Sequence, residues 1–325
     1  MKRDLSLDFL KFSLVILVIL GHAIQFYLAK FGYDFDESTL YRFIYSFHMP
    51  LFIFLSGCLF SLSKTLEVFK LFKLLIIPFF VWGSINFFIK ESDLTFIEHI
   101  YKIVVSPDSS LWFLWVLFWL MLSTNILLRL SKGVNVLFLL LSLLYGVFLY
   151  ITFLIFDLSS FGFKLYTWYW FFFISGVFFY KNKSGLGGLK RNRINISLVI
   201  AYVFVFTLWK RDINSYDFFF NPIINSAIGL MVNYICSFLF ITFVAINWQY
   251  MKSTLFPRCI VFCSVNSLAF YAIQFPVIDT LLRYDFTSNI FIDILCVFFL
   301  SILISSFLIV IINKFSFCRR ILFGR

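Results

Sequence analysis

The chain has 325 residues, of which 62% are hydrophobic and 13% are charged, and its mean hydropathy is +0.97. A soluble domain is roughly half apolar. Here the apolar residues form runs long enough to cross a bilayer, which excludes an ordinary soluble domain. The net charge of +11 would suggest a nucleic-acid partner in a soluble protein. In a membrane protein it is better explained by cytoplasmic loops that face anionic lipids, so we expect no nucleic-acid partner.

Ten apolar segments follow one another along the chain, and we interpret each as a membrane-spanning helix. They cover residues 9–29, 43–63, 73–90, 111–129, 134–156, 165–181, 194–210, 222–248, 259–281 and 289–313. The first is too long for a signal peptide. Pro78 and Pro276 lie inside spans, where we expect a local kink or break. The sequence predicts an all-α polytopic protein with one domain over residues 1–325 and no appended soluble domain.

The distribution of basic residues predicts the orientation of these spans. With the N-terminus in the cytoplasm, 18 of the 27 Lys and Arg residues fall in the inner segments and eight in the outer ones. Lys11 lies within the first span. Cytoplasmic loops of membrane proteins carry this excess, so both termini are expected to be cytoplasmic. The six cysteines fall mostly in apolar runs and lack the spacing of a metal site, so neither a disulfide framework nor a bound metal is expected.

The first two spans each contain a histidine, and the first also contains a lysine. Lys11 and His22 are eleven residues apart, which on a helix puts them on one face about 16 Å apart along the axis. His48 is followed by Pro50 in the second span. Both imidazoles are expected in the outer half of the membrane, where a titratable group marks a functional site by default. The alternative is that each histidine hydrogen-bonds a carbonyl and fixes helix packing.

These residues resemble the acyltransferase-3 family of membrane O-acyltransferases. The first helix of that family carries Arg or Lys, ten residues and then His, as Lys11 and His22 do here. Its second helix has a phrase close to FHMPLFIFLSG, found at residues 47–57. Weaker matches are Lys70-x-x-Lys73, LWFL at 111–114, FFFISG at 171–176 and NSLAFYAIQFP at 266–276. In two respects the chain departs from the family pattern. Gln274 replaces a frequent His, and the basic pair is lysine where arginine is common, which removes bidentate phosphate geometry.

The resemblance implies transfer of an acyl group, usually acetyl from acetyl-CoA, to a sugar hydroxyl. The acceptor would be a bacterial surface polysaccharide or its lipid-linked precursor, and the enzyme would sit in the cytoplasmic (inner) membrane. Expected partners are the acyl-CoA donor, the glycan acceptor and membrane lipids, with no metal. We expect His22 to act as general base or transient acyl carrier, with His48 orienting it or binding substrate. The donor's phosphates would contact Lys11, Lys70 and Lys73. The acceptor would contact Trp112, Asn233 and Gln274.

Two other classes of protein fit the composition. A proton-coupled transporter or flippase for a glycolipid would use the histidines as a proton relay. Such a protein would favour internal repeats with broken helices in matching positions, and the sequence has no repeat. A scaffold without chemistry would tolerate replacement of Lys11, His22 and His48. The sequence leaves open the sugar, its hydroxyl, the acyl group and the oligomeric state.

Overall fold

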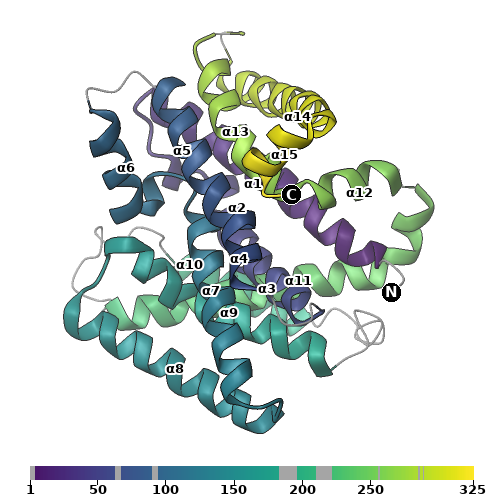
Figure 1. Ribbon diagram of the computed structural model, residues 1–325. Helices are drawn as coiled ribbons and strands as arrows, with labels where there is room; N and C mark the ends of the chain where they lie inside the picture. The colour runs from purple at the N-terminus through teal and green to yellow at the C-terminus, as the bar shows by residue number, and fades with distance from the viewer. Residues whose placement is uncertain are drawn as a thin grey trace. The chain divides into compact units, whose positions relative to one another are not determined.

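The structure is a computed structural model that describes residues 4–62, 67–89, 94–182, 196–209, 222–254, 257–284, 286–287 and 289–325. All regular secondary structure in these residues is helical (Figure 1), which confirms the predicted class. Contacts divide the chain into two compact units. Unit 1 comprises Met1–Phe52 and Lys183–Phe307, and unit 2 comprises Ile53–Asn182 and Leu308–Arg325. The predicted single domain is not tested by this division.

Seven described helical segments are long and apolar enough to cross a membrane, and a bent helix pair would add an eighth. The seven are Leu5–Lys30, Thr39–Phe60, Val68–Ile89, Trp112–Leu130, Asn135–Phe156, Ala227–Asn247 and Ile290–Lys314. The other two predicted spans are also helical. However, α9 (Phe163–Asn182) is not among the candidates, and the apolar part of α10 (Ile196–Leu208) is too short. In α9 the Tyr- and Trp-rich stretch YTWYW lowers the hydropathy.

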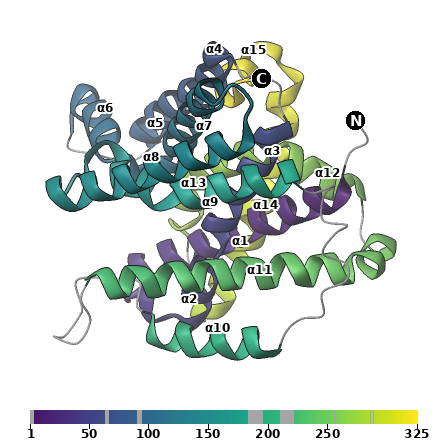
Figure 2. The ribbon, with the colours of Figure 1, turned by 90° about the horizontal axis from the view of Figure 1, so that it is seen from below.

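Unit 1 is built around α1 (Leu5–Lys30), which the Asp4 carboxylate caps by accepting a hydrogen bond from the Ser6 amide. Its buried core includes Ile24 and two residues of the following helix, Tyr41 and Ile44. Four α-helices contact α1, and Figure 1 shows their course. They are α2 (Thr39–Tyr45), α11 (Pro222–Thr254), α12 (Pro257–Val265) and α13 (Ser267–Leu281). In the same unit, α10 lies along α11 (Figure 2).

Unit 2 contains the remaining helices, together with most of α3 (His48–Leu62). They are α4 (Val68–Leu71), the π-helix η2 (Phe72–Ile76), α5 (Ile77–Ile89), α6 (Phe96–Val105), α7 (Trp112–Leu130), α8 (Asn135–Phe156), α9 and α15 (Ser316–Phe323). The helix α14 (Ile290–Lys314) starts in unit 1 and ends in unit 2. Within unit 2, α7 contacts α5, α8 and α9.

Two glycines allow the backbones of α3 and α9 to touch inside unit 2. A Cβ atom on Gly57 would lie 2.1 Å from the Phe173 carbonyl oxygen, and one on Gly176 would lie 2.0 Å from the Phe54 carbonyl oxygen. Only a residue without a side chain fits at either position, as in other close crossings of membrane helices. The Ser-Gly pairs that end FHMPLFIFLSG and FFFISG therefore meet at one helix crossing, in keeping with the close approach expected for such small residues.

Within the second span (Thr39–Phe60), a short break separates α2 from α3 immediately before His48, without the sharp bend seen between α12 and α13. Pro50 is the third residue of α3 and has no N–H to donate to the carbonyl of Ser46, so a new helix starts here. At the same break, the Ser46 hydroxyl donates to the Phe43 carbonyl at 2.7 Å. Sequence analysis did not predict this break, because it treated residues 43–63 as one continuous helix.

The two prolines expected to distort spans behave differently. Pro78 is the second residue of α5, and α5 directly follows the five-residue π-helix η2, as expected for a local distortion. Pro276 lies inside α13, which continues through it. The bend in this region measures 78° and lies between α12 and α13, at Asn266. The Phe262 carbonyl accepts two hydrogen bonds at this bend, from the Asn266 backbone N–H at 3.0 Å and from the Asn266 side-chain amide at 2.8 Å.

Candidate functional site

The first helix is uninterrupted from Leu5 to Lys30, so Lys11 and His22 lie on one face as predicted. The His22 side chain is half-buried. Its ring stacks on Phe26 of the same helix, with centroids 5.6 Å apart, and lies 4.6 Å from the ring of Phe275 in α13. The late helix that carries Gln274 is therefore next to His22.

Tyr45 connects the two helical segments that carry the histidines. Its hydroxyl donates a hydrogen bond to the Gln25 side-chain oxygen at 2.9 Å, and its ring meets the His48 ring edge-on at 4.5 Å. Gly21 leaves room for this ring, since a Cβ there would lie 3.0 Å from it. Sequence analysis missed Gln25 and Tyr45. The signal was present, because Gln25 follows His22 by three residues and Tyr45 precedes His48 by three.

His48 is 1% exposed, and its Nδ1 lies 2.7 Å from the Ile44 carbonyl oxygen. A carbonyl oxygen can only accept a hydrogen bond, so Nδ1 carries the proton. In the neutral ring this leaves Nε2 as the atom with a lone pair. The bond to Ile44 is of the kind expected if His48 fixes helix packing. It also limits any proton transfer by His48 to Nε2.

A buried carboxylate lies near the start of α1. Asp8 is 8% exposed and accepts a hydrogen bond of 2.6 Å from the Ser264 hydroxyl in α12. Lys11 follows Asp8 by three residues and is half-buried. Helical residues three apart are neighbours, so Asp8 puts a negative charge beside the lysine. Sequence analysis did not single out Asp8, although its spacing from Lys11 could have drawn attention to it.

Two predicted acceptor contacts of unit 1 have buried side-chain oxygens. Asn233 in α11 is 5% exposed and Gln274 in α13 is fully buried. Among the described residues, the Asn233 Oδ1 and Gln274 Oε1 atoms have no hydrogen-bond partner. The Gln274 amide nitrogen donates to the Tyr271 carbonyl at 3.3 Å. Buried polar atoms are nearly always hydrogen-bonded, so these two oxygens are suited to accept a bond from a hydroxyl group.

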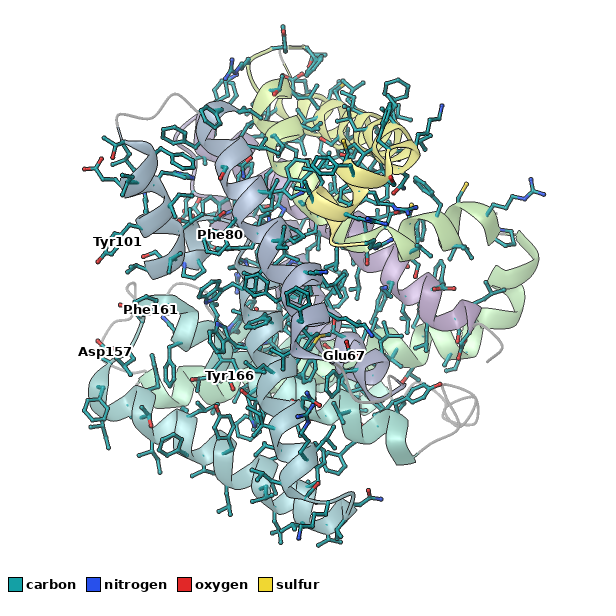
Figure 3. All side chains as sticks on the ribbon, in the orientation of Figure 1. Glu67, Phe80, Tyr101, Asp157, Phe161 and Tyr166 are labelled. Carbon is teal, nitrogen blue, oxygen red and sulfur yellow. The ribbon has the colours of Figure 1, made fainter. Side chains whose placement is uncertain are left out.

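The other three predicted residues belong to unit 2. Lys70 in α4 is exposed and pairs at 3.2 Å with Glu67, which is labelled in Figure 3. The Lys73 ammonium lies 4.3 Å from the centroid of the Phe69 ring. Trp112, the first residue of α7, stacks on Tyr169 with centroids 5.2 Å apart and an angle of 14° between the rings. The structure thus gives each residue a defined environment, and their roles remain predictions.

Comparison with known proteins identifies the family. The family model described as an acyltransferase domain, that of acyltransferase-3, matches residues 4–311. Two curated relatives are named nodulation protein NolL. The protein from Mesorhizobium japonicum is 31% identical over 125 residues, covering 36% of this chain and 34% of the relative. The protein from Sinorhizobium fredii is 46% identical over 59 residues, covering 18% of this chain and 16% of the relative.

The alignments therefore span about a third or less of these relatives. No solved structure matches the chain. The family match includes both histidine-bearing segments, the lysine pair and the late helix with Gln274, and so covers all the motifs on which the resemblance rested. The chain belongs to the acyltransferase-3 family and is a multi-pass membrane acyltransferase.

Proposed function

We propose that this acyltransferase moves an acetyl group from acetyl-CoA to a sugar hydroxyl of a bacterial surface polysaccharide or its lipid-linked precursor. The observation that carries the proposal is the environment of His22. Its half-buried imidazole lies on the face of α1 that also holds Lys11, between Phe26 and Phe275. An imidazole in an apolar helix is costly unless it is used, and proton transfer near pH 7 is its characteristic use.

In the proposed reaction, His22 removes the proton of the acceptor hydroxyl as the oxygen attacks the thioester carbonyl of the donor. A carbon–oxygen bond forms, the carbon–sulfur bond breaks, and CoA leaves as a thiolate that takes up the proton from His22. The other possibility is that His22 first carries the acyl group on its own nitrogen. His48 would orient His22 or bind substrate, and its Nε2 is the nitrogen that can accept a hydrogen bond.

The donor would be held through its phosphates and the acceptor through its hydroxyls. Lys11, Lys70 and Lys73 are the proposed donor contacts, since lysine binds phosphate as a point charge. Asn233 and Gln274 are proposed to accept hydrogen bonds from sugar hydroxyls, supported by their buried side-chain oxygens, which have no partner in the described part of the chain. Trp112 would offer an aromatic surface to the sugar. A membrane crossed ten times with both termini in the cytoplasm, as the basic loops predict, would put the lysines on the side that supplies acetyl-CoA.

Mass spectrometry of the surface glycan tests this proposal in cells with and without the gene. Deletion should remove the mass of one acetyl group per modified sugar, and the wild-type gene should restore it. His22→Ala should fail to restore it, because loss of a general base lowers the rate by about 10²–10⁴-fold. His99→Ala is the matched control, since His99 lies in α6 and its ring contacts Phe87 and the Gly83 carbonyl. Each variant must be present in the membrane at the wild-type level.

An acetylated glycan in the His22→Ala strain would refute the role of His22, and an unchanged glycan mass after deletion would refute the reaction. The two roles of His22 are separated by incubating the purified protein with labelled acetyl-CoA and no acceptor. A labelled peptide containing His22 would establish an acyl carrier. An unlabelled protein that nevertheless acetylates added acceptor would establish a general base.

A further inference from the structure

The C-terminal helix α15 is attached to the segment that carries the two lysines of unit 2. It contacts η2 and α5 (Figure 2). The Trp82 indole in α5 donates a hydrogen bond of 2.9 Å to the Leu322 carbonyl, and Phe323 is 2% exposed. Residues separated by some 240 positions in the chain are thereby held together. The short helix α15 is thus packed against the other helices of unit 2.

Gly324 sets the distance between the end of α15 and Lys73. Its φ of +69° is in the left-handed region that favours glycine. A Cβ at this position would lie 2.5 Å from both the Lys73 carbonyl oxygen and the Leu74 Cα atom. The two backbones are therefore as close as a glycine allows, and the next residue, Arg325, emerges directly beside Lys73.

This arrangement brings the segment that carries Lys70 and Lys73 next to the helix end that carries Arg319 and Arg325. Lys70, Lys73 and Arg319 are exposed and Arg325 is half-buried. The Arg325 amide contacts the Arg319 carbonyl at 3.5 Å, and burial together with the charge of Arg319 lowers the pKa of Arg325. The carboxylate of Glu67 pairs with Lys70, but both side chains are 69% exposed, so this pair is weak and easily exchanged. Like charges held close together favour a bound anion.

We propose that Lys70, Lys73, Arg319 and Arg325 form one phosphate-binding site, with α15 supplying its arginines. The lysines act as point charges, whereas guanidinium groups add the bidentate geometry that a lysine pair lacks. The phosphate would belong to the nucleotide part of the acyl donor. This assignment of the ligand rests on the proposed function. An anionic lipid headgroup offers the same chemistry, and the experiment below separates the two.

The test measures CoA binding to the purified full chain in nanodiscs of phosphatidylcholine, which needs neither acceptor nor acyl transfer. Arg319→Gln and Arg325→Gln should each weaken binding by about tenfold, the loss expected for one charge-assisted contact. Arg320→Gln is the matched control. It removes the same charge from an equally exposed position of the same helix, which is turned about 100° around the helix axis from Arg319. Its binding should stay within about twofold of wild type.

A second variant tests the docking of α15 without changing any charge. Gly324→Ala introduces a Cβ against the Lys73 and Leu74 backbone at a left-handed φ, so α15 must shift. Weaker CoA binding by this variant, at unchanged monodispersity, would support a site that depends on α15. Equal affinity of Arg319→Gln, Arg325→Gln and Arg320→Gln for CoA would overturn the proposal for the donor.

The lipid arm uses the same proteins in nanodiscs that contain phosphatidylglycerol, with retained lipid measured by native mass spectrometry. If wild type binds no CoA, the donor assigned under the proposed function is wrong. The phosphate site is still supported if Arg319→Gln loses phosphatidylglycerol and Arg320→Gln keeps it. If neither CoA nor phosphatidylglycerol distinguishes Arg319→Gln from Arg320→Gln, the site does not exist.

Discussion

Replacing Gly57 or Gly176 by alanine should force α3 and α9 apart where their backbones touch. The added Cβ would lie 2.1 Å from the Phe173 oxygen in one variant and 2.0 Å from the Phe54 oxygen in the other. Real Cβ atoms essentially never approach closer than 3.0 Å, so the helices must separate by about 1 Å. The obstacle in both variants is a backbone carbonyl, which cannot rotate away as a side chain can.

The expected loss of stability is at the upper end of that for overpacked cores, about 3 kcal/mol. Because 1 kcal/mol shifts the midpoint of a chain of 150–250 residues by about 2–4 °C, and the shift shrinks with chain length, each variant of this 325-residue chain should unfold roughly 6 °C below wild type. The double variant should lose less than the sum of the two single losses. Once the first Cβ has separated the helices, the second has room, and residues that share a contact are not additive.

The assay is the apparent midpoint of thermal unfolding in detergent, followed by intrinsic fluorescence at one fixed scan rate. Gly83→Ala is the control, since its Cβ would meet only the Ile103 Cδ1 atom, at 2.6 Å, the end of a flexible side chain. It should lower the midpoint by a few degrees at most. Midpoints for Gly57→Ala and Gly176→Ala equal to that of Gly83→Ala would refute the close crossing.

Two further predictions concern single hydrogen bonds. Tyr45→Phe keeps the ring on His48 but removes the hydroxyl that donates to Gln25, so stability should fall by about 1–2 kcal/mol and acyl transfer should slow. Tyr101→Phe is the control, since the Tyr101 ring, labelled in Figure 3, is 70% exposed, and this variant should change neither stability nor acyl transfer. Thermal unfolding and glycan acetylation are the measurements. Equal results for the two variants would contradict the role of Tyr45. The Glu98 carboxylate accepts hydrogen bonds from the Thr95 amide and hydroxyl, and these bonds lower the pKa of Glu98. They therefore stabilise α6 fully above pH 4.5, the ordinary pKa of a glutamate, and this stabilisation is lost as the pH falls through the lowered pKa. Hydrogen exchange of α6 should therefore rise, relative to the rest of the chain, as the pH falls below 4.5 in wild type, and this rise should be absent in Glu98→Gln.

Sequence analysis predicted helices over all ten apolar segments, and the helical breaks were less predictable. A break before Pro50 follows from its missing N–H, but the apolar pattern runs through residues 43–63 and hid it. Pro276 was expected to distort its helix, yet α13 continues and the 78° bend lies at Asn266. A proline removes one backbone bond, which neighbouring helices can compensate. An asparagine offers an additional side-chain bond to the backbone, whose use depends on its surroundings.

For the candidate site, the sequence by itself determined which residues stand out as candidates, and their roles in the chemistry stay predictions. Titratable side chains are rare in apolar helices, so His22, His48 and Lys11 can be recognised without a structure. The helical period then predicts that Lys11 and His22 share a face. The spans are equally readable, because a backbone in lipid must satisfy its hydrogen bonds within its own helix.

Only the tertiary structure decided what surrounds these residues. Tyr45 lies between Gln25 and His48, Phe275 covers the His22 ring, and Gly324 meets the backbone of Lys73. Each contact joins segments whose local patterns are independent of one another. Local hydrogen bonding follows from neighbouring residues, whereas contacts between distant segments depend on how whole side-chain surfaces fit together, and no period in the sequence records that fit.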